Sequence, residues 1–486
     1  MSRFPVPSRA ELALCAMAIL ATAVWPRVLA AQACTVSGVT GAQCLAVTVP
    51  ENRAEPAGRA LRLRAIILPA RATPKRAEPI VFLAGGPGQA ASSLADFAAN
   101  TLGPALADRD VVLLDQRGTG ESNPLRCALY GDGSRAAPFY GDLLPDAAVR
   151  ACRAALDRTA DPRHYTTADA VQDLEALRVA IGAEQVWLYG TSYGTRVAFE
   201  YMREHPDRVR GAVLKGVAPP GFLTPLSYPR DAQAALDAMF DACDADAACR
   251  GAYPQARQTF AGMRERLEAG STVELPGATG AAETITLRWD GVAAALIGLL
   301  QSPAGAAQIP LLFHLAAQGQ IAPLATLVRD YRRNLTEQLS LGMFLSVTCA
   351  EDLPFITAAD AAREAQGTFL GQIRFQEQRD ACAAWPVPRA DAQMREPVAS
   401  NAPVLLISGA LDPVTPPRHA ERAMPTLPNA VHVVVANASH SFNGMGGCVE
   451  NIIGAFLRTD SVPAAERACI ARIVRPPFAL PRTPHS

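Results

Sequence analysis

A short apolar run that ends in a glycine-flanked serine constrains the fold of this chain most strongly. Residues 186–189 read Val-Trp-Leu-Tyr; Gly190-Thr191-Ser192-Tyr193-Gly194 follows, and then a stretch with helical periodicity. Small residues on both sides of the serine permit a sharp turn that lifts its hydroxyl above the edge of a sheet. The G-x-S-x-G pattern alone is a weak signal, because glycine and serine are common in loops. Between a strand and a helix it becomes a strong one.

Short β-rich runs bounded by turn residues recur along the chain. Helical stretches at 167–181 and 193–204 lie between several of them. Near-continuous apolar strands that alternate with helices indicate a mostly parallel sheet with helices on both faces, so the predicted fold class is α/β. The predicted strands are 80–83, 111–114, 186–189, 209–213, 404–407 and 431–435.

The alternation of strands and helices stops between about residues 221 and 395. Amphipathic helices dominate there, interrupted by one predicted hairpin with strands at 272–275 and 284–288. A chain of 486 residues has the length of about three domains, or of one large domain with an insertion. The pattern favours the second. We expect a leader at 1–33, the first part of the core at 34–220, a mainly helical cap insertion at 221–395, and the second part of the core at 396–486.

The N-terminus has the pattern of an export signal. Arg3 and Arg9 precede an apolar run over 12–25, and small residues follow up to Ala33. The run is shorter than the roughly 20 residues that a membrane-spanning helix needs, so it is typical of a cleaved signal peptide. Cleavage is expected after Ala30 or Ala33. Cys34 raises a lipoprotein alternative, but residues 31–33 lack the bulky residue that such a site requires. We therefore expect a bacterial protein exported to the periplasm or the medium, without stable membrane association.

The cysteine count agrees with export. Of eleven cysteines, Cys15 belongs to the leader and ten remain. An even number in an oxidising compartment suits a set of disulfides, although sequence alone does not determine their pairing. Neither C-x-x-C nor a metal-type Cys/His spacing is present, so no metal and no cofactor is expected. The pairing hypothesis is Cys34–Cys44, Cys127–Cys152, Cys243–Cys249, Cys349–Cys382 and Cys448–Cys469.

The charge of the chain excludes one class of partner. It has 45 basic and 46 acidic residues, a net charge of -1, and no block of Lys or Arg. Low charge with ample apolar content argues against disorder. Without a basic patch, binding to nucleic acid is not expected.

Two residues in the second part of the core can activate Ser192. A serine nucleophile needs a general base and an acid that orients the base. His440 comes shortly after the strand at 431–435, and Asp412 follows the strand at 404–407; the other six histidines lie in helical stretches, a strand or the tail. A lone histidine can be structural, and an aspartate before Pro413 can be a turn residue. The chain order Ser192, Asp412, His440 nevertheless matches a serine–aspartate–histidine triad at such a turn.

An oxyanion formed at Ser192 would need two N–H donors. One is expected to be the backbone N–H of Tyr193, and the second to come from the loop after an earlier strand. That loop is Ala84-Gly85-Gly86-Pro87-Gly88, directly after 80–83. Pro87 has no N–H, so Gly86 is the predicted donor. A plain glycine turn is the alternative, whereas a phosphate loop would require a lysine and a spacing that are absent.

Five short segments carry a family resemblance. They are Gly85–Gly88 after an apolar strand, Asp115–Ser122, Gly190–Gly194, Leu411–Pro416 and Ser439-His440. Together they resemble secreted α/β-hydrolase-fold exopeptidases of the tripeptidyl aminopeptidase and proline iminopeptidase group, family S33 with a TAP-like C-terminal region. The resemblance extends from about Ile80 to Cys469 and is weakest in the insertion. Ala84 replaces the usual histidine of proline iminopeptidases, which favours the tripeptidyl branch.

This resemblance implies hydrolysis of peptides from a free N-terminus through an acyl-enzyme on Ser192, with the insertion as a cap over the site. The expected substrate is a peptide or a small ester, since a carboxylesterase with the same triad remains the alternative. A binding protein without catalysis is disfavoured by the intact triad.

An aminopeptidase must also bind the substrate ammonium, for which a carboxylate is the natural partner. The stretch Ser346–Pro354 resembles one in the tripeptidyl group and contains Glu351 next to Asp352. Glu351 is the predicted amine anchor. Alternatively, these two acids cap a helix or pair with an arginine.

Overall fold

The computed structural model describes residues 27–276, 282–442 and 445–481. The predicted leader therefore falls mostly outside the described residues. Its last seven residues, Arg27–Ala33, form an edge strand, β1, that pairs antiparallel with the next strand.

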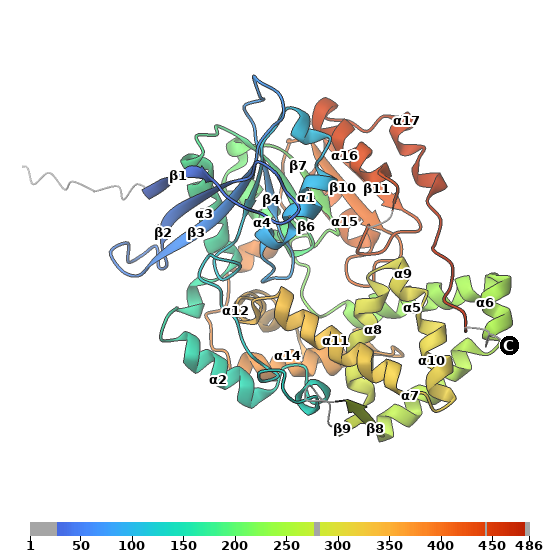
Figure 1. The fold of residues 1–486 in the computed structure, drawn as a ribbon. Helices are drawn as coiled ribbons and strands as arrows, with labels where there is room; N and C mark the ends of the chain where they lie inside the picture. Colours follow the sequence, from blue (N-terminus) through green and yellow to red (C-terminus); the bar gives the residue numbers. More distant parts are fainter. Residues whose placement is uncertain (1–26, 277–281, 443–444, 482–486) are drawn as a thin grey trace, which may run out of the picture.

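A nine-stranded sheet forms the centre of the core, in the upper part of Figure 1. Six neighbouring strands run parallel, and they are the six that the sequence predicts. The other three, β1 to β3, run antiparallel at one edge. In spatial order the strands are β1, β2 (Gln43–Pro50), β3 (Ala60–Leu68), β5 (Val111–Leu114), β4 (Ile80–Leu83), β6 (Val186–Thr191), β7 (Val209–Lys215), β10 (Val404–Gly409) and β11 (Ala430–Val435).

Helices cover both faces of this sheet, and successive residues of each strand supply the two cores. In β4, Val81 and Leu83 pack beneath α3 (Thr167–Ala180), α4 (Tyr193–Glu204) and α15 (Pro417–Ala423). Ile80 and Phe82 pack on the opposite face, against α1 (Ala95–Thr101) and α16 (Cys448–Thr459). Burial of both faces explains the near-continuous apolar strands. The prediction of an α/β fold with a mostly parallel sheet is confirmed.

The antiparallel edge was not predicted. β3 alternates outward and inward residues, with Leu61 and Leu63 buried and Arg62 exposed between them. Such alternation is typical of a strand with one solvated face, and it gives a weaker signal than a continuous apolar run.

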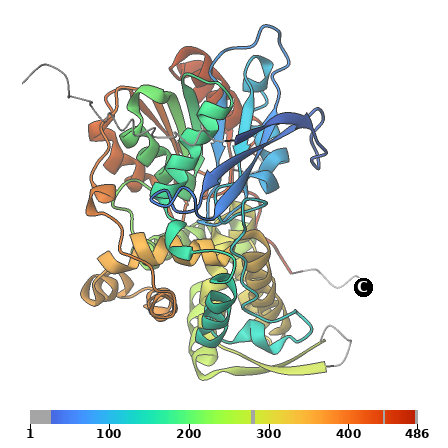
Figure 2. The same cartoon turned by 90° about the vertical axis from the view of Figure 1, so that its left-hand side faces the viewer.

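A largely helical layer lies between β7 and β10 in sequence and beneath the sheet in Figure 1. We call it the cap. Its hairpin, β8 (Ser271–Pro276) with β9 (Ala282–Leu287), lies at the end of the cap far from the sheet (Figure 2). The cap helices are α5 (Tyr228–Ala245), α6 (Ala247–Ala252), α7 (Ala256–Ala269), α8 (Trp289–Leu300), α9 (Pro303–Ala306), α10 (Ile309–Ala317), α11 (Ala322–Gln338), α12 (Leu341–Glu351), α13 (Ala358–Ala365) and α14 (Ile373–Ala383).

A segment that precedes β6 also packs with the cap, although the predicted cap begins at residue 221. It contains the short helix η3 (Ala137–Tyr140) and α2 (Asp146–Leu156), and its buried side chains join the cap core. The Tyr140 hydroxyl donates to the carbonyl of Ala325 in α11 at 3.0 Å. Glu377 of α14 accepts from the Leu143 N–H at 2.8 Å. The cap therefore consists of two pieces of chain that are separate in sequence and share one buried core.

No single helix among the described residues is long and apolar enough to cross a membrane. One bent pair, Leu341–Phe355 with Ala358–Ala365, passes the same test of length and composition.

Candidate active site

The serine of the G-x-S-x-G turn has the backbone of a nucleophile elbow. Ser192 lies between β6 and α4 with φ 53° and ψ −122°, in the positive-φ region that side-chain-bearing residues rarely adopt. Its N–H donates to the carbonyl of Lys215 at 2.9 Å, which fixes the turn against β7. A Cβ at Gly194 would lie 2.1 Å from the carbonyl oxygen of Leu83, and one at Gly190 would lie 2.7 Å from that of Gly194. Glycine is therefore required on both sides of the serine.

Asp412 and His440 form the acid–base pair expected from the sequence. Asp412 lies in the loop after β10 and is buried, whereas 17% of the His440 side chain is exposed. The Nδ1 atom of His440 is 2.7 Å from Oδ2 of Asp412. Since the carboxylate holds Nδ1, Nε2 is left to serve as the base.

Hydrogen bonds keep the buried Asp412 carboxylate ionised. Burial alone would raise its pKa, but His440 and the N–H groups of Thr415 and Val414 outweigh burial and leave the pKa below its ordinary value. These N–H groups donate to Oδ1 at 2.9 and 2.8 Å. The Thr415 hydroxyl donates to Oδ2 at 2.8 Å.

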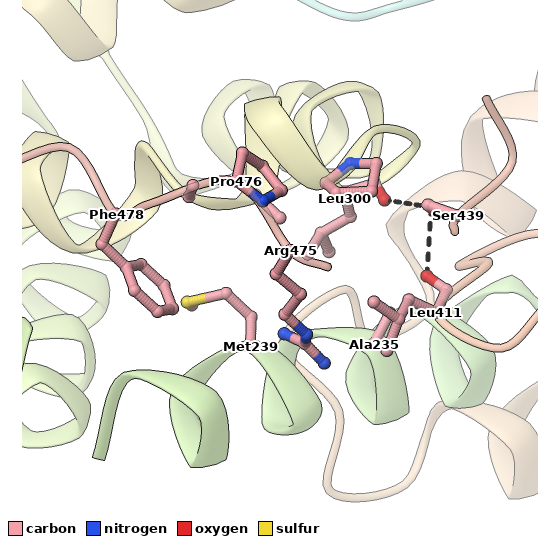
Figure 3. A pocket seen from close by; sticks show the side chains of 11 residues that line it. Ala235, Met239, Leu300, Leu411, Ser439, Arg475, Pro476 and Phe478 are labelled. Atoms are coloured by element: carbon pink, nitrogen blue, oxygen red, sulfur yellow. Dashed lines mark hydrogen bonds between the residues drawn. The ribbon is translucent and has the colours of Figure 1, made fainter. Parts of the chain in front are cut away.

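The loop that carries His440 is attached to the cap on both sides of the histidine. The Ser439 hydroxyl donates to the carbonyls of Leu300 at 2.5 Å and Leu411 at 3.1 Å (Figure 3). The Ser441 N–H donates to the carbonyl of Gln301 at 2.8 Å. Leu300 and Gln301 form the C-terminal end of α8. A cap helix thereby holds the loop that carries the predicted base.

The two expected oxyanion donors lie at the same site. Tyr193 is the first residue of α4, and Gly86 lines the cavity that contains Ser192. Neither N–H is bonded to a backbone carbonyl in the described part of the chain. A Cβ at the neighbouring Gly85 would lie 3.1 Å from Cβ of Ser192, so the glycine loop approaches the nucleophile closely. Among the described residues both N–H groups thus lack a backbone acceptor, as the predicted role of oxyanion donor requires.

The site opens into a cavity of about 800 Å³ between the core and the cap. Ser192, His440 and the Gly85–Gly86 loop form its floor, and residues of α8, α10, α11 and α12 form much of its wall. Its volume is within the range of sites that enclose a ligand of a few residues.

Glu351, the predicted amine anchor, lies outside the cavity that contains Ser192. It is 6% exposed and absent from the cavity lining. Its carboxylate accepts from the Thr167 N–H at 2.6 Å and hydroxyl at 2.7 Å, and it pairs with Arg196 at 3.3 Å. Arg196 also pairs with Asp352 at 2.9 Å. The structure thus has the alternative, two adjacent acids paired with one buried arginine, and the Glu351 carboxylate is already bonded on both oxygens.

Three charged residues of the cavity wall were missed. They are Asp330 on α11, Arg374 on α14 and Lys215 at the end of β7. No local motif marks the first two. Lys215 could have been recognised from the sequence as a candidate site residue. It ends an apolar strand at the carboxyl edge of the sheet, and it is one of two lysines in the chain.

The ten predicted cysteines form five disulfides in the pairs that the hypothesis names. Two lie in the core, two in the cap, and one closes the α2 segment on itself.

Comparisons with known proteins agree with this geometry. Residues 78–266 match the family described as alpha/beta hydrolase fold, and residues 369–469 match the family described as TAP-like protein. The first match covers the glycine loop and Ser192, and the second covers Asp412 and His440.

Curated relatives include three named peptidases. The serine protease Hip1 of Mycobacterium tuberculosis is 30% identical over 37% of this chain and 36% of its own. A proline iminopeptidase of Neisseria gonorrhoeae is 30% identical over 29% of this chain and 32% of its own. A tripeptidyl aminopeptidase of Streptomyces coelicolor is 29% identical over 37% and 35%. The match thus spans about a third of the length of each relative.

Proposed function

We propose that this chain, which has the α/β-hydrolase fold, is an exported serine aminopeptidase that releases short peptides from free N-termini. The observation that carries the proposal is that the strained Ser192, the Gly85–Gly86 loop and His440, which Asp412 holds from behind, meet in one capped cavity. The names of the relatives support a peptidase, and the five disulfides support export.

In the proposed cycle, Nε2 of His440 takes the Ser192 proton as Oγ attacks the scissile carbonyl. The carbonyl oxygen becomes an oxyanion that accepts from the Gly86 and Tyr193 N–H groups. Asp412 holds the histidine in the required tautomer and stabilises its charged form. His440 then protonates the leaving amine, and a water molecule repeats the steps to release the acyl peptide.

Recognition of a free N-terminus follows from the cap. A cavity roofed by helices admits the end of a peptide more readily than the middle of a folded chain. Asp330 supplies the only carboxylate among the described residues that line it. Asp330 also contacts Arg329 at 3.1 Å, and about half of its side chain is exposed, so it can exchange this neighbour for a ligand. We infer that Asp330 binds the substrate ammonium.

Paired substrates test the aminopeptidase function. We expect the purified enzyme to cleave a tripeptidyl amide with a free amine at least about a hundredfold faster, in kcat/KM, than the N-acetylated amide, because acetylation removes the charge that a carboxylate binds. Equal rates on both amides would contradict the exopeptidase assignment.

Asp330→Asn tests the proposed anchor. The change should raise KM for the free-amine substrate about tenfold or more and leave the acetylated substrate little affected, since one charge-assisted contact is lost. Asp380→Asn is the matched control, because Asp380 also pairs with the preceding arginine but lies outside the cavity lining. An equal effect of both changes would remove Asp330 from amine binding.

A carboxylesterase remains the second candidate, because attack by Ser192 on an ester uses the same groups. The names of the relatives favour the peptidase. Hydrolysis of small aryl esters by an enzyme that cleaves neither the free nor the acetylated tripeptidyl amide would reverse this order.

A further inference from the structure

Lys215 places a buried ammonium group at the wall of the catalytic cavity. It is the last residue of β7, between β6, which leads to Ser192, and β10, which leads to Asp412. It is only 7% exposed, and it lines the same cavity as Ser192 and His440. The proposed catalytic cycle does not use the Lys215 ammonium.

The ammonium of Lys215 lies against two aromatic rings. Its Nζ lies 4.8 Å from the ring centroid of Phe97 and 5.1 Å from that of Phe442. In the described ranges this Nζ makes no ion pair and no hydrogen bond. The other lysine, Lys75, pairs with Asp110 at the surface instead. Two aromatic faces compensate a buried cation only in part, so an anion that enters the cavity would gain a strong contact.

Burial and two carboxylates set the ionisation of Lys215. Burial lowers its pKa to about 8, against the opposing influence of Glu450 on α16 and Asp412 after β10. His440 is a further titratable group in the lining of the same cavity. The lysine is therefore mostly charged at neutral pH and loses its charge as pH rises through about 8.

Arg374 is a second cation in the wall of the same cavity. Nη1 of Arg374 is buried without a hydrogen-bond partner. Among the described lining residues there are two such cations, Lys215 and Arg374, and one carboxylate, that of Asp330. The wall thus carries an excess of positive charge, which favours a ligand with an anionic group in addition to its N-terminal ammonium.

We propose that Lys215 forms a carboxylate-binding subsite beside the scissile bond, so that the enzyme prefers peptides with an acidic residue flanking that bond. The inference rests on the proposed peptidase function and adds the substrate class. The carboxylate comes from the side chain of the residue whose carbonyl is attacked, or from the residue on the leaving side. An ammonium at the end of an aliphatic stem binds either carboxylate as a point charge.

A substrate panel tests this subsite and separates the two sources. Free-amine peptides carry Glu or the isosteric Gln, in one pair before the scissile bond and in another after it. We expect the wild-type enzyme to favour Glu at least about tenfold in kcat/KM in one of the two pairs. Lys215→Met should bring that ratio close to one, Lys215→Arg should retain part of it, and Lys75→Met should leave it as in the wild type.

The pH dependence of the same ratio requires no variant, so it stands even if Lys215→Met fails to fold. From about pH 6.5 to about pH 9.5 the preference for Glu should fall with a midpoint near 8, as the ammonium deprotonates. Titration of His440 affects both members of a pair alike and cancels in the ratio.

The substrate panel distinguishes failure of the carboxylate subsite from failure of the proposed peptidase function. Cleavage of both members of each pair at equal rates, or a preference for Glu that survives in Lys215→Met, would overturn the carboxylate subsite and leave the peptidase function standing. Failure to cleave any peptide of the panel would overturn the proposed function itself.

Discussion

The hydroxyl of Thr415 contacts both Asp412 and His440, the proposed acid and base. It donates to Oδ2 of Asp412 at 2.8 Å and lies 3.1 Å from Nδ1 of His440. With the N–H groups of Thr415 and Val414, it surrounds a carboxylate that would otherwise be costly to bury. The ionised state of Asp412, and with it the orientation of His440, depends on these donors.

Thr415→Val should therefore weaken catalysis and change its pH profile. The folded-state pKa of Asp412 lies below its ordinary value, so the carboxylate stays ionised as pH falls through the range where a free aspartate takes up a proton. Loss of one donor raises this pKa, so activity should be lost at a higher pH on the acid side, with kcat/KM about tenfold lower at neutral pH. Thr415→Ser keeps the hydroxyl and should keep the wild-type profile. An unchanged acid limb in Thr415→Val would contradict this role.

Gly194→Ala tests the elbow itself. Because the added Cβ would lie 2.1 Å from the Leu83 carbonyl oxygen, β4 and the nucleophile turn must separate. We expect a loss of stability of roughly 2–4 kcal/mol in chemical denaturation and an inactive or nearly inactive enzyme. Gly251→Ala, in a helix with open space around the new Cβ, should be close to neutral in both measurements. Comparable losses in the two variants would contradict the steric account.

Ser192, Asp412 and His440 were predictable because each follows an apolar strand at the carboxyl edge of a parallel sheet, where loop residues converge. The position of Glu351 was not predictable, because it depends on Arg196, which reaches it from α4. Nothing near Glu351 in sequence shows that Arg196, 155 residues earlier, neutralises it.

Among the elements, the C-terminal end of α8 holds the loop of the proposed base. Its last carbonyls hold the His440 loop through the Ser439 hydroxyl and the Ser441 N–H. The tail crosses from the core to the cap beside the same loop, where Arg475, Pro476 and Phe478 pack over α5 (Figure 3). Within its described residues the tail reaches the cap, since the Ala479 N–H donates to the carbonyl of Ala307 at 3.1 Å.

Ser439→Ala should slow the reaction and leave substrate binding nearly unchanged. It removes the side-chain contacts to Leu300 and Leu411, so the base is positioned less well. We expect kcat to fall about three- to tenfold with little change in KM. Ser93→Ala, which removes an exposed hydroxyl that also donates to a backbone carbonyl, is the control. A change confined to KM would show that the contact serves binding instead.

The strand and helix order was largely accessible from sequence, because each parallel strand is a short apolar run. The antiparallel strands β1 to β3 were not predicted, since their alternation is a weaker pattern. The predicted hairpin in the cap corresponds to β8 and β9 within one or two residues at each end.

On the scale of the whole molecule, one sheet carries a cap built from two separate pieces of chain. The disulfide Cys127–Cys152 closes the earlier piece, and Cys349–Cys382 joins α12 to α14 in the later one. Sequence order predicted only the later piece. The earlier one joins the cap through buried residues such as Phe139 and Tyr140, whose partners on α11 are remote in sequence.

Reduction of the disulfides should lower stability because it frees loops in the unfolded chain. We expect the melting temperature to fall by several degrees in reducing buffer, and non-reducing peptide mapping to recover the five pairs named above. Free thiols in the protein isolated from its native compartment would contradict both the pairing and the proposed export.

The central claim is that Ser192, activated by His440 and Asp412, is the nucleophile of a peptidase. Labelling with a serine-directed fluorophosphonate, followed by peptide mass spectrometry, tests it most directly. We expect a single label on Oγ of Ser192, loss of peptide hydrolysis in proportion to labelling, and almost no labelling in His440→Ala. A label on another residue, or peptide hydrolysis that persists after complete labelling of Ser192, would contradict the mechanism.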